Sequence, residues 1–172
     1  KIVLASGNAV KLIELQQILA QKEISLLPQA EFAIGDVEET GLSFVENALI
    51  KARNACRYSG LPSIADDSGL VVDCLQGAPG VHSARFAGEK ATDSDNLKKL
   101  LQAVEEFSAK ERTARFKCAM VYLRSESDPS PLISVGTWEG RISMTARGRR
   151  GFGYDPVFLV IDLKRTSAEL EP

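Results

Sequence analysis

The segment that most constrains the fold of this chain spans residues 64–70 and reads Ile-Ala-Asp-Asp-Ser-Gly-Leu. Two adjacent carboxylates, Asp66 and Asp67, follow a short apolar stub, and the apolar run 70–72 comes soon after. This pattern predicts a strand, an acidic turn and a second strand. Carboxylates in such a place are costly to bury without a cation. A fold that contains this segment must therefore supply a cation or leave the turn in water.

Two interpretations of the acidic segment are equally supported by these residues alone. In the structural one, Asp and Gly form a turn that is held by local hydrogen bonds. In the functional one, Asp66 and Asp67 hold Mg²⁺ or orient a water molecule, and Ser68 offers its N–H and hydroxyl to a phosphate oxygen.

Composition limits the class of protein. The chain has 172 residues, of which 44% are hydrophobic and 26% charged, as expected for a soluble globular protein. This length predicts one domain over 1–172 that is large enough for a proper core, and a division of that domain into two lobes is an alternative. The net charge of −2 argues against binding to nucleic acid or to an anionic membrane. No stretch approaches the roughly 20 apolar residues that span a bilayer.

Cysteine and histidine usage narrows the chemistry. The three cysteines, Cys56, Cys74 and Cys118, are far apart and odd in number, which favours buried thiols in a reducing, cytoplasmic setting. The only histidine is His82, so a multi-histidine zinc site is excluded and a Ser-His-Asp triad is disfavoured.

The order of periodic segments predicts a mixed α/β or α+β sheet flanked by helices. Apolar spacing and capping residues predict three helices: one that begins after Asn8, one that is capped by Ser43 with Glu46 and stopped by 60–62, and one that is capped by Thr92. Apolar runs predict further strands at 2–5, 24–27, 116–123, 132–142 and 157–161, with an acidic loop at 35–41 and a hairpin-type loop at 125–131.

The first predicted strand leads into a small-residue turn, Ser6-Gly7-Asn8, that opens a helix. Free backbone N–H groups at a helix start form a natural seat for phosphate. Lys11 lies in the first turn, where it opposes the helix dipole, and a bound anion would offset that cost. The alternative is an ordinary helix cap followed by a surface lysine, and this motif by itself favours it.

Two further segments have both a functional and a structural interpretation. Glu38 and Glu39 form a solvated loop or, together with the later aspartates, complete an oxygen-only shell for magnesium. The corner 151–156, Gly-Phe-Gly-Tyr-Asp-Pro, suits stacking on a purine, although in isolation an aromatic corner packed on the core is favoured. The positively charged side chains of Lys51 and Arg85 could each reach a phosphate, but most lysines and arginines are simply solvated.

Taken together, these motifs resemble the inosine triphosphate pyrophosphatase family, in its bacterial form, which hydrolyses nonstandard purine nucleoside triphosphates. The similarity runs over nearly the whole chain, and five motifs in order make it specific. They are Ser6-Gly7-Asn8 with Lys11 and Glu14; Glu38 to Gly41 with Phe44, Glu46 to Ala48, Lys51 and Ala52; Ile64 to Leu70; Gly77 to Gly80 with Ser83 to Arg85; and Gly151 to Pro156.

The resemblance implies a two-lobed α/β fold with a long central mixed sheet flanked by helices and a substrate cleft between the lobes. It also implies a homodimer that depends on Mg²⁺. The reaction would convert dITP, ITP or XTP and water into the monophosphate and pyrophosphate, in preference to ATP and GTP, and so clear these nucleotides from the pool.

The resemblance also assigns roles to residues. Asp67 and Lys11 would be catalytic, with Asp67 accepting the proton of the attacking water. Glu38 and Asp67 would serve the metal, with the choice between Glu38 and Glu39 resting on the resemblance alone. The substrate-binding residues would be Ser6, Gly7, Asn8, Lys11, Lys51, Ser68 and Arg85 at the phosphates, and Phe152, Gly153, Tyr154 and Asp155 at the base.

One departure from the family leads to an alternative function. The family continues into a segment with a lysine and a Ser-His-Arg motif that contact the purine, whereas this sequence stops at 169–172. A chain truncated there, or one with an incomplete base pocket, would be a nucleotide-binding protein with impaired catalysis. A third hypothesis is a related pyrophosphatase that acts on modified pyrimidines.

Overall fold

The computed structural model describes residues 1–19, 22 and 24–171. Its strands are β1 (Ile2–Leu4), β2 (Leu26–Pro28), β3 (Ser63–Val72), β4 (Thr113–Leu123), β5 (Leu132–Ile142), β6 (Phe158–Val160) and β7 (Arg165–Thr166). The α-helices are α1 (Ala9–Leu19), α2 (Phe44–Ser59) and α3 (Asp93–Ala103), and short 3₁₀ turns are η2 (Gln29–Phe32), η3 (Asp73–Leu75), η4 (Gly80–Arg85) and η5 (Ser167–Glu169).

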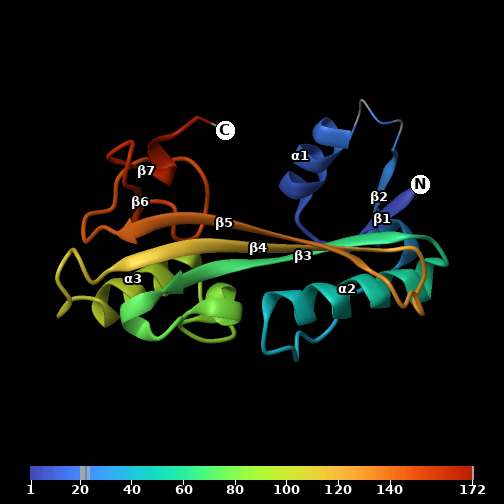
Figure 1. The fold of residues 1–172 in the computed structure, drawn as a ribbon, viewed down its shortest axis with the longest axis horizontal. Coiled ribbons are helices and arrows are strands. Elements are labelled where there is room, and N and C mark those ends of the chain that lie inside the picture. Colours follow the sequence, from blue (N-terminus) through green and yellow to red (C-terminus); the bar gives the residue numbers. More distant parts are fainter. Residues whose placement is uncertain (20–21, 23, 172) are drawn as a thin grey trace. The chain divides into compact units, whose positions relative to one another are not determined.

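The described strands form one mixed sheet in the order β2-β1-β3-β4-β5-β6-β7 (Figure 1). Strand β1 pairs in parallel with both β2 and β3, with Val3 opposite Leu27 on one side and Ser63 on the other. Strand β6 pairs antiparallel with β5 and β7. The expected α/β class and the mixed sheet flanked by helices are therefore confirmed.

Two of the predicted helices, α2 and α3, begin where their capping residues predict. Ser43 accepts a hydrogen bond from the N–H of Glu46 at the start of α2, and Gly60 ends this helix in the left-handed conformation. Thr92 and Asp95 form a reciprocal capping box at the start of α3. Such caps satisfy backbone groups that the first and last turns leave without partners.

The prediction of an acidic turn at Asp66 and Asp67 was wrong. Residues 63–72 form one unbroken strand, β3, with both aspartates in its middle. Asp and Gly are poor strand formers, but tertiary pairing outweighs such weak preferences. Strand β4 also begins at Thr113, earlier than predicted, and the two-residue strand β7 was not predicted at all.

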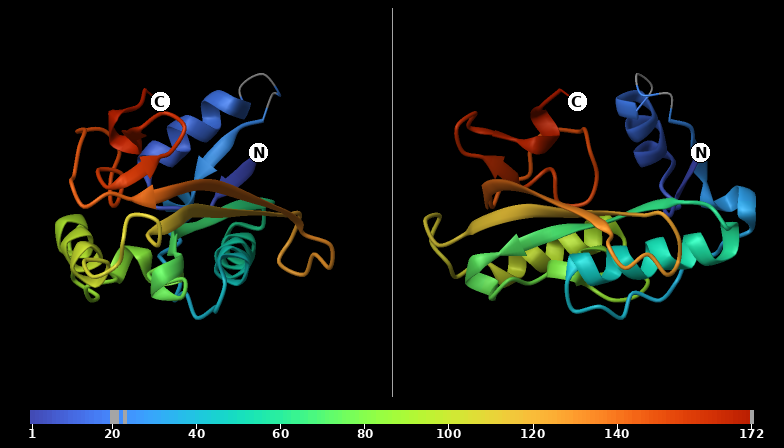
Figure 2. Two further views of the ribbon diagram at one scale, coloured as in Figure 1. Left: turned by 60° about the vertical axis from the view of Figure 1, so that its left-hand side comes forward. Right: turned by 45° about the vertical axis from the view of Figure 1, so that its right-hand side comes forward.

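By their internal contacts the residues form two compact units. Unit 1 comprises residues 1–67 and 118–135, and unit 2 comprises 68–117 and 136–172. In unit 1, α2 covers one face of the strands and α1 lies on the other face (Figure 2). Its core joins small residues of α2 to the sheet: Val3, Ala5, Ala48, Ala52, Ala55, Cys56, Ala65, Val121 and Leu123.

Unit 2 has a core of larger side chains. Phe158 is fully buried, and its ring lies 4.4 Å from that of Phe116 and 5.5 Å from that of Trp138. Leu100 of α3 and Val104, which follows the end of this helix, pack into the same cluster. In the described part of the chain, none of the helices has the length and apolar character that crossing a membrane requires.

Candidate active site

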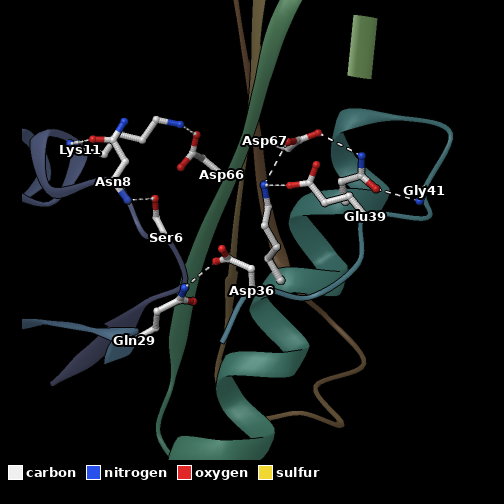
Figure 3. A network of polar contacts seen from close by, with 11 residues as sticks. Ser6, Asn8, Lys11, Gln29, Asp36, Glu39, Gly41, Asp66 and Asp67 are labelled. Atoms are coloured by element: carbon white, nitrogen blue, oxygen red, sulfur yellow. Dashed lines mark hydrogen bonds and ion pairs between the residues drawn. The ribbon is translucent and has the colours of Figure 1, made fainter. Parts of the chain in front are cut away.

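The two central aspartates of β3 point to opposite faces of the sheet. Successive side chains of a strand alternate in direction, so Asp66 and Asp67 cannot share one face. Figure 3 shows Asp66 directed toward α1 and Asp67 toward α2. Both are nearly inaccessible, at 6% and 7% of full exposure. Each therefore needs partners on its own side of the sheet.

On the α1 side, the loop between β1 and α1 is held by its own side chains. The N–H of Asn8 donates to Ser6 Oγ at 3.1 Å, and the N–H of Lys11 donates to Asn8 Oδ1 at 3.4 Å. The ammonium group of Lys11 pairs with Asp66 (Figure 3). The unfavourable position of Lys11 in the first turn is thus offset in this structure by a carboxylate.

On the α2 side, one ammonium group lies between two carboxylates. Lys51 Nζ is 2.8 Å from Glu39 Oε1 and 3.0 Å from Asp67 Oδ1. Burial alone would lower the pKa of Lys51, but hydrogen bonds and charges from Glu39 and Asp67 raise it above its ordinary value. Burial raises the pKa of Asp67 above its ordinary value. Lys51 and Asn47 oppose this rise, and the negative charge of Glu39 adds to it.

A side chain that lies in one of the quoted motifs, but to which no role was assigned from the sequence, completes this group. Asn47 is fully buried, its Nδ2 donates to Asp67 Oδ2 at 3.3 Å, and its Oδ1 accepts the N–H of Gly41 at 2.8 Å. Asn47 and Lys51 are four residues apart and so share one face of α2. That i,i+4 spacing is the signal by which both could have been assigned to Asp67.

The structure distinguishes the two neighbouring glutamates. Glu39 is partly buried and its carboxylate is bonded to Lys51 beside Asp67, whereas Glu38 is exposed. The assignment of Glu38 to the metal stays a prediction. The geometry favours Glu39 as the second carboxylate.

Between these two sets of contacts unit 1 has a pocket of about 320 Å³. Lys11 and Lys51 both line it, and so do Asp66 and Glu39. The remaining lining residues are Ala5, Ser6, Gly7, Asn8, Gln29, Gly35, Asp36, Val37 and Asn54. Sequence reasoning missed Gln29 and Asp36, which hydrogen-bond to each other at 3.2 Å. Two lysines and a helix start in one concave surface suit a phosphate group.

The donor set fits Mg²⁺ only if the substrate contributes ligands. Among the described residues there is no group of three or more His, Cys, Asp or Glu side chains placed to hold a metal ion. Glu39 and Asp67 are nevertheless close enough to share the ammonium group of Lys51. Mg²⁺ is commonly bound by one or two carboxylates together with water and substrate phosphates. This pair meets that requirement.

The other predicted phosphate contacts belong to unit 2. Ser68 follows Asp67 directly and its side chain is exposed. Arg85 ends η4 and lies 3.7 Å from Glu89. Their assignment to phosphates stays a prediction.

In the aromatic corner of unit 2, only Phe152 presents a large apolar surface, with 67% of it exposed. Tyr154 is buried, its hydroxyl donates to the carbonyl of Ser83 at 2.7 Å, and burial raises its pKa. The Asp155 carboxylate accepts the N–H of Phe152 and the hydroxyl of Ser167. Tyr154 and Asp155 thus shape the corner, while Phe152 is available for stacking.

Comparison with known proteins places this geometry in a family. The family model described as the Ham1 family matches residues 2–172. The chain belongs to the Ham1 family. A curated relative from Thioalkalivibrio sulfidiphilus, named dITP/XTP pyrophosphatase, is 55% identical over 172 residues, which is 100% of this chain and 88% of the relative. A relative of the same name from Coxiella burnetii is 51% identical and is covered to 86%.

Solved structures of similar proteins share the fold. A HAM1 protein from Coxiella burnetii matches with a TM-score of 0.96 and 51% identity, over 99% of this chain and 87% of that one. A nucleoside-triphosphatase, or dITP/XTP pyrophosphatase, from Mycobacterium abscessus matches with a TM-score of 0.87 and 39% identity, over 98% and 88%. The resemblance inferred from the sequence motifs is confirmed.

Proposed function

We propose that this protein hydrolyses the nonstandard purine nucleoside triphosphates dITP, ITP and XTP to the monophosphate and pyrophosphate, and so removes them from the nucleotide pool. The curated relatives that bear this activity in their name match the whole chain at 51–55% identity. The observation that carries the proposal is the group of two carboxylates and one ammonium, Glu39, Asp67 and Lys51, beside a pocket with a second lysine. The comparisons lend no support to a binding protein without catalysis.

The reaction needs negative charge on the phosphates to be screened. Lys11 at the start of α1 and Lys51 on α2 place two positive charges on the wall of one pocket. The backbone N–H groups of the α1 start add fixed dipoles that need no rearrangement. We assign these groups, with Ser6 and Asn8, to binding and orienting the triphosphate.

Asp67 is the group that we assign to the proton of the attacking water. Its burial raises its pKa toward the range of an effective base, and Lys51 holds one of its oxygens. We propose that Glu39 and Asp67 hold Mg²⁺ together with substrate phosphates. When bound, the metal would supply Lewis-acid polarisation of phosphate oxygens and help to ionise the water.

We further propose a cytoplasmic homodimer. Both expectations rest on the sequence, through its resemblance to the family and its scattered cysteines. Light scattering at several protein concentrations tests the dimer.

Replacement of Asp67 by Asn tests the proposed reaction. Pyrophosphate release from dITP, XTP, dATP and dGTP is measured with and without Mg²⁺ for the wild type and for Asp67→Asn. The wild type should prefer dITP and XTP and require Mg²⁺. Asp67→Asn should lose about 10²–10⁴-fold in kcat, the usual contribution of a positioned base.

Asp162→Asn is the matched control, because Asp162 is exposed in unit 2 and the same charge is removed there. It should keep wild-type kcat, and circular dichroism should show both variants folded. A wild-type protein that turns over neither dITP nor XTP in Mg²⁺ would sink the proposal.

A further inference from the structure

Asn47 is the buried polar side chain that links the two parts of the carboxylate pair. Burying an amide is costly unless its hydrogen-bonding groups are satisfied. Here both ends are used: Oδ1 accepts the N–H of Gly41 at 2.8 Å, and Nδ2 donates to Asp67 Oδ2 at 3.3 Å. One rigid carboxamide thus contacts the backbone of the acidic loop and the carboxylate of β3.

The orientation of this carboxamide is fixed by chemistry. A backbone N–H can only donate, so the atom of Asn47 that faces Gly41 must be the oxygen. The NH₂ group then faces Asp67 Oδ2, while Asp67 Oδ1 is left to Lys51. The two oxygens of Asp67 are therefore held by different partners, which fixes the rotation of the carboxylate.

The contact with Gly41 extends this control to Glu39. Gly41 lies two residues after Glu39 and packs tightly on the start of α2. A Cβ at position 41 would lie 2.6 Å from Glu46 Cβ and 2.7 Å from Asn47 Oδ1. The loop that carries Glu39 is thus seated against the same asparagine that holds Asp67.

We propose that Asn47 is a positioning residue of the active site, which sets the separation and orientation of Asp67 and Glu39 without adding charge. The inference rests on the proposed function for its catalytic part. A neutral amide suits this place because a lysine or arginine would compete with Lys51 and the metal for the same oxygens. A carboxylate would instead repel Asp67.

The contact between residues 47 and 67 can be tested without any activity. Asn47→Asp keeps the size of the side chain and an oxygen for Gly41, but it places a second carboxylate against Asp67. The thermal midpoint of this variant, measured without metal or substrate, should fall. Addition of Asp67→Asn exchanges the two groups and restores an amide facing a carboxylate, so the midpoint should recover most of the loss. If the double variant shows no recovery, the contact does not operate in solution.

The catalytic part is tested by steady-state kinetics on dITP in saturating Mg²⁺. Asn47→Asp should lower kcat by about 10–100-fold and change KM by less than about threefold. The reason is that Asp67 and Glu39 lose their alignment, while the lysines assigned to the phosphates remain in place. Gln102→Glu on the exposed face of α3 adds the same charge elsewhere and should keep wild-type kcat.

A third measurement separates the two ends of the amide. Hydrogen exchange should show the Gly41 amide protected in the wild type and in Asn47→Asp, and exposed in Asn47→Ala. Wild-type kcat in Asn47→Asp, with the stability coupling present, would leave Asn47 a structural residue and overturn its positioning role. A protein inactive on every nucleotide would defeat the proposed function instead, and the stability and exchange results would stand apart from it.

Discussion

Two buried asparagines occupy equivalent positions in two helices, one in each unit. Asn47 lies four residues after the cap Ser43 of α2, and Asn96 lies four residues after the cap Thr92 of α3. Each accepts a backbone N–H from the preceding loop through Oδ1, from Gly41 at 2.8 Å and from an alanine at 2.7 Å. The local device is the same in both units.

The two asparagines differ in what the NH₂ group holds. Asn47 donates to the carboxylate of Asp67, whereas Asn96 donates to the backbone carbonyl of Ala84 at 2.9 Å. The partners of Asn96, Ala84 and Ala87, are exposed, so water can replace a hydrogen bond that either of them loses. Asn96 thus joins two backbone segments, whereas Asn47 joins a backbone segment to the carboxylate that we assign to catalysis. The same capped-helix asparagine therefore serves different purposes in the two units, and the group that its NH₂ contacts is what distinguishes them.

The largest effect is expected where the loop itself approaches the helix. Gly41→Ala would place a methyl group 2.6 Å from Glu46 Cβ, so the loop must shift away from Asn47. We expect kcat on dITP to fall about tenfold or more, and stability to fall by about 1–3 kcal/mol from overpacking.

The counterpart of Gly41 in unit 2 is Ala87, which already carries a methyl group and is exposed. Ala87→Ser should change stability by less than about 0.5 kcal/mol. Kinetics and urea denaturation of both variants make the measurement. Equal effects of the two substitutions would break the contrast between the loops.

The next effect concerns Asn96 itself. Asn96→Ala removes the hydrogen bonds to Ala84 and Ala87, which should cost about 1–3 kcal/mol in urea denaturation. Its kcat should be reduced far less than that of Asn47→Ala. A kcat as low as that of the Asn47 variant would show that the two asparagines do the same work.

The smallest effect on stability is expected at Thr92 and Asp95, which form the cap of α3, and it depends on pH. The hydroxyl and the N–H of Thr92 donate to Asp95 and lower the pKa of this carboxyl. A lowered pKa in the fold stabilises the protein above the ordinary Asp pKa of about 3.9, and that contribution is lost as the pH falls through the folded value.

Asp95→Asn should therefore lower the thermal midpoint at pH 7, and its difference from the wild type should shrink as the pH is lowered below about 4. Thermal melts at both ends of this range make the comparison. A difference that stays constant with pH would mean that the charge of Asp95 contributes nothing to the cap.

Local rules predicted most of the fold, because helix caps and apolar spacing act over a few residues. Ser43 and Thr92 marked their helices, and strand β5 was predicted with its observed bounds. The prediction of an acidic turn failed because ion pairs with Lys11 and Lys51, which come from distant segments, outweighed the preference of Asp for turns.

The site was predictable to the same degree. Charged residues with an evident chemical use, such as Lys11 and Asp67, could be selected from the sequence. Asn47 has no such evident use: its i,i+4 spacing places it on the same helix face as Lys51, but its contacts with Gly41 and Asp67 depend on the fold. Gln29 and Asp36 entered the pocket in the same way, through tertiary proximity alone.

The alternation of side chains along β3 limits which sequence changes the two aspartates can tolerate. Because Asp66 and Asp67 face opposite sides, the insertion or deletion of one residue before them would exchange their faces, as a one-residue register slip does in any strand. After a deletion, Asp67 would take the place beside Lys11, and Ser68 would face Lys51. After an insertion, Asp66 would face Lys51, and the residue before it would face Lys11. The pair reads as one acidic motif in the sequence, but it is two single-residue sites that share a backbone. A substitution can change one aspartate without disturbing the other, whereas an insertion or deletion before them in β3 disturbs both contacts at once.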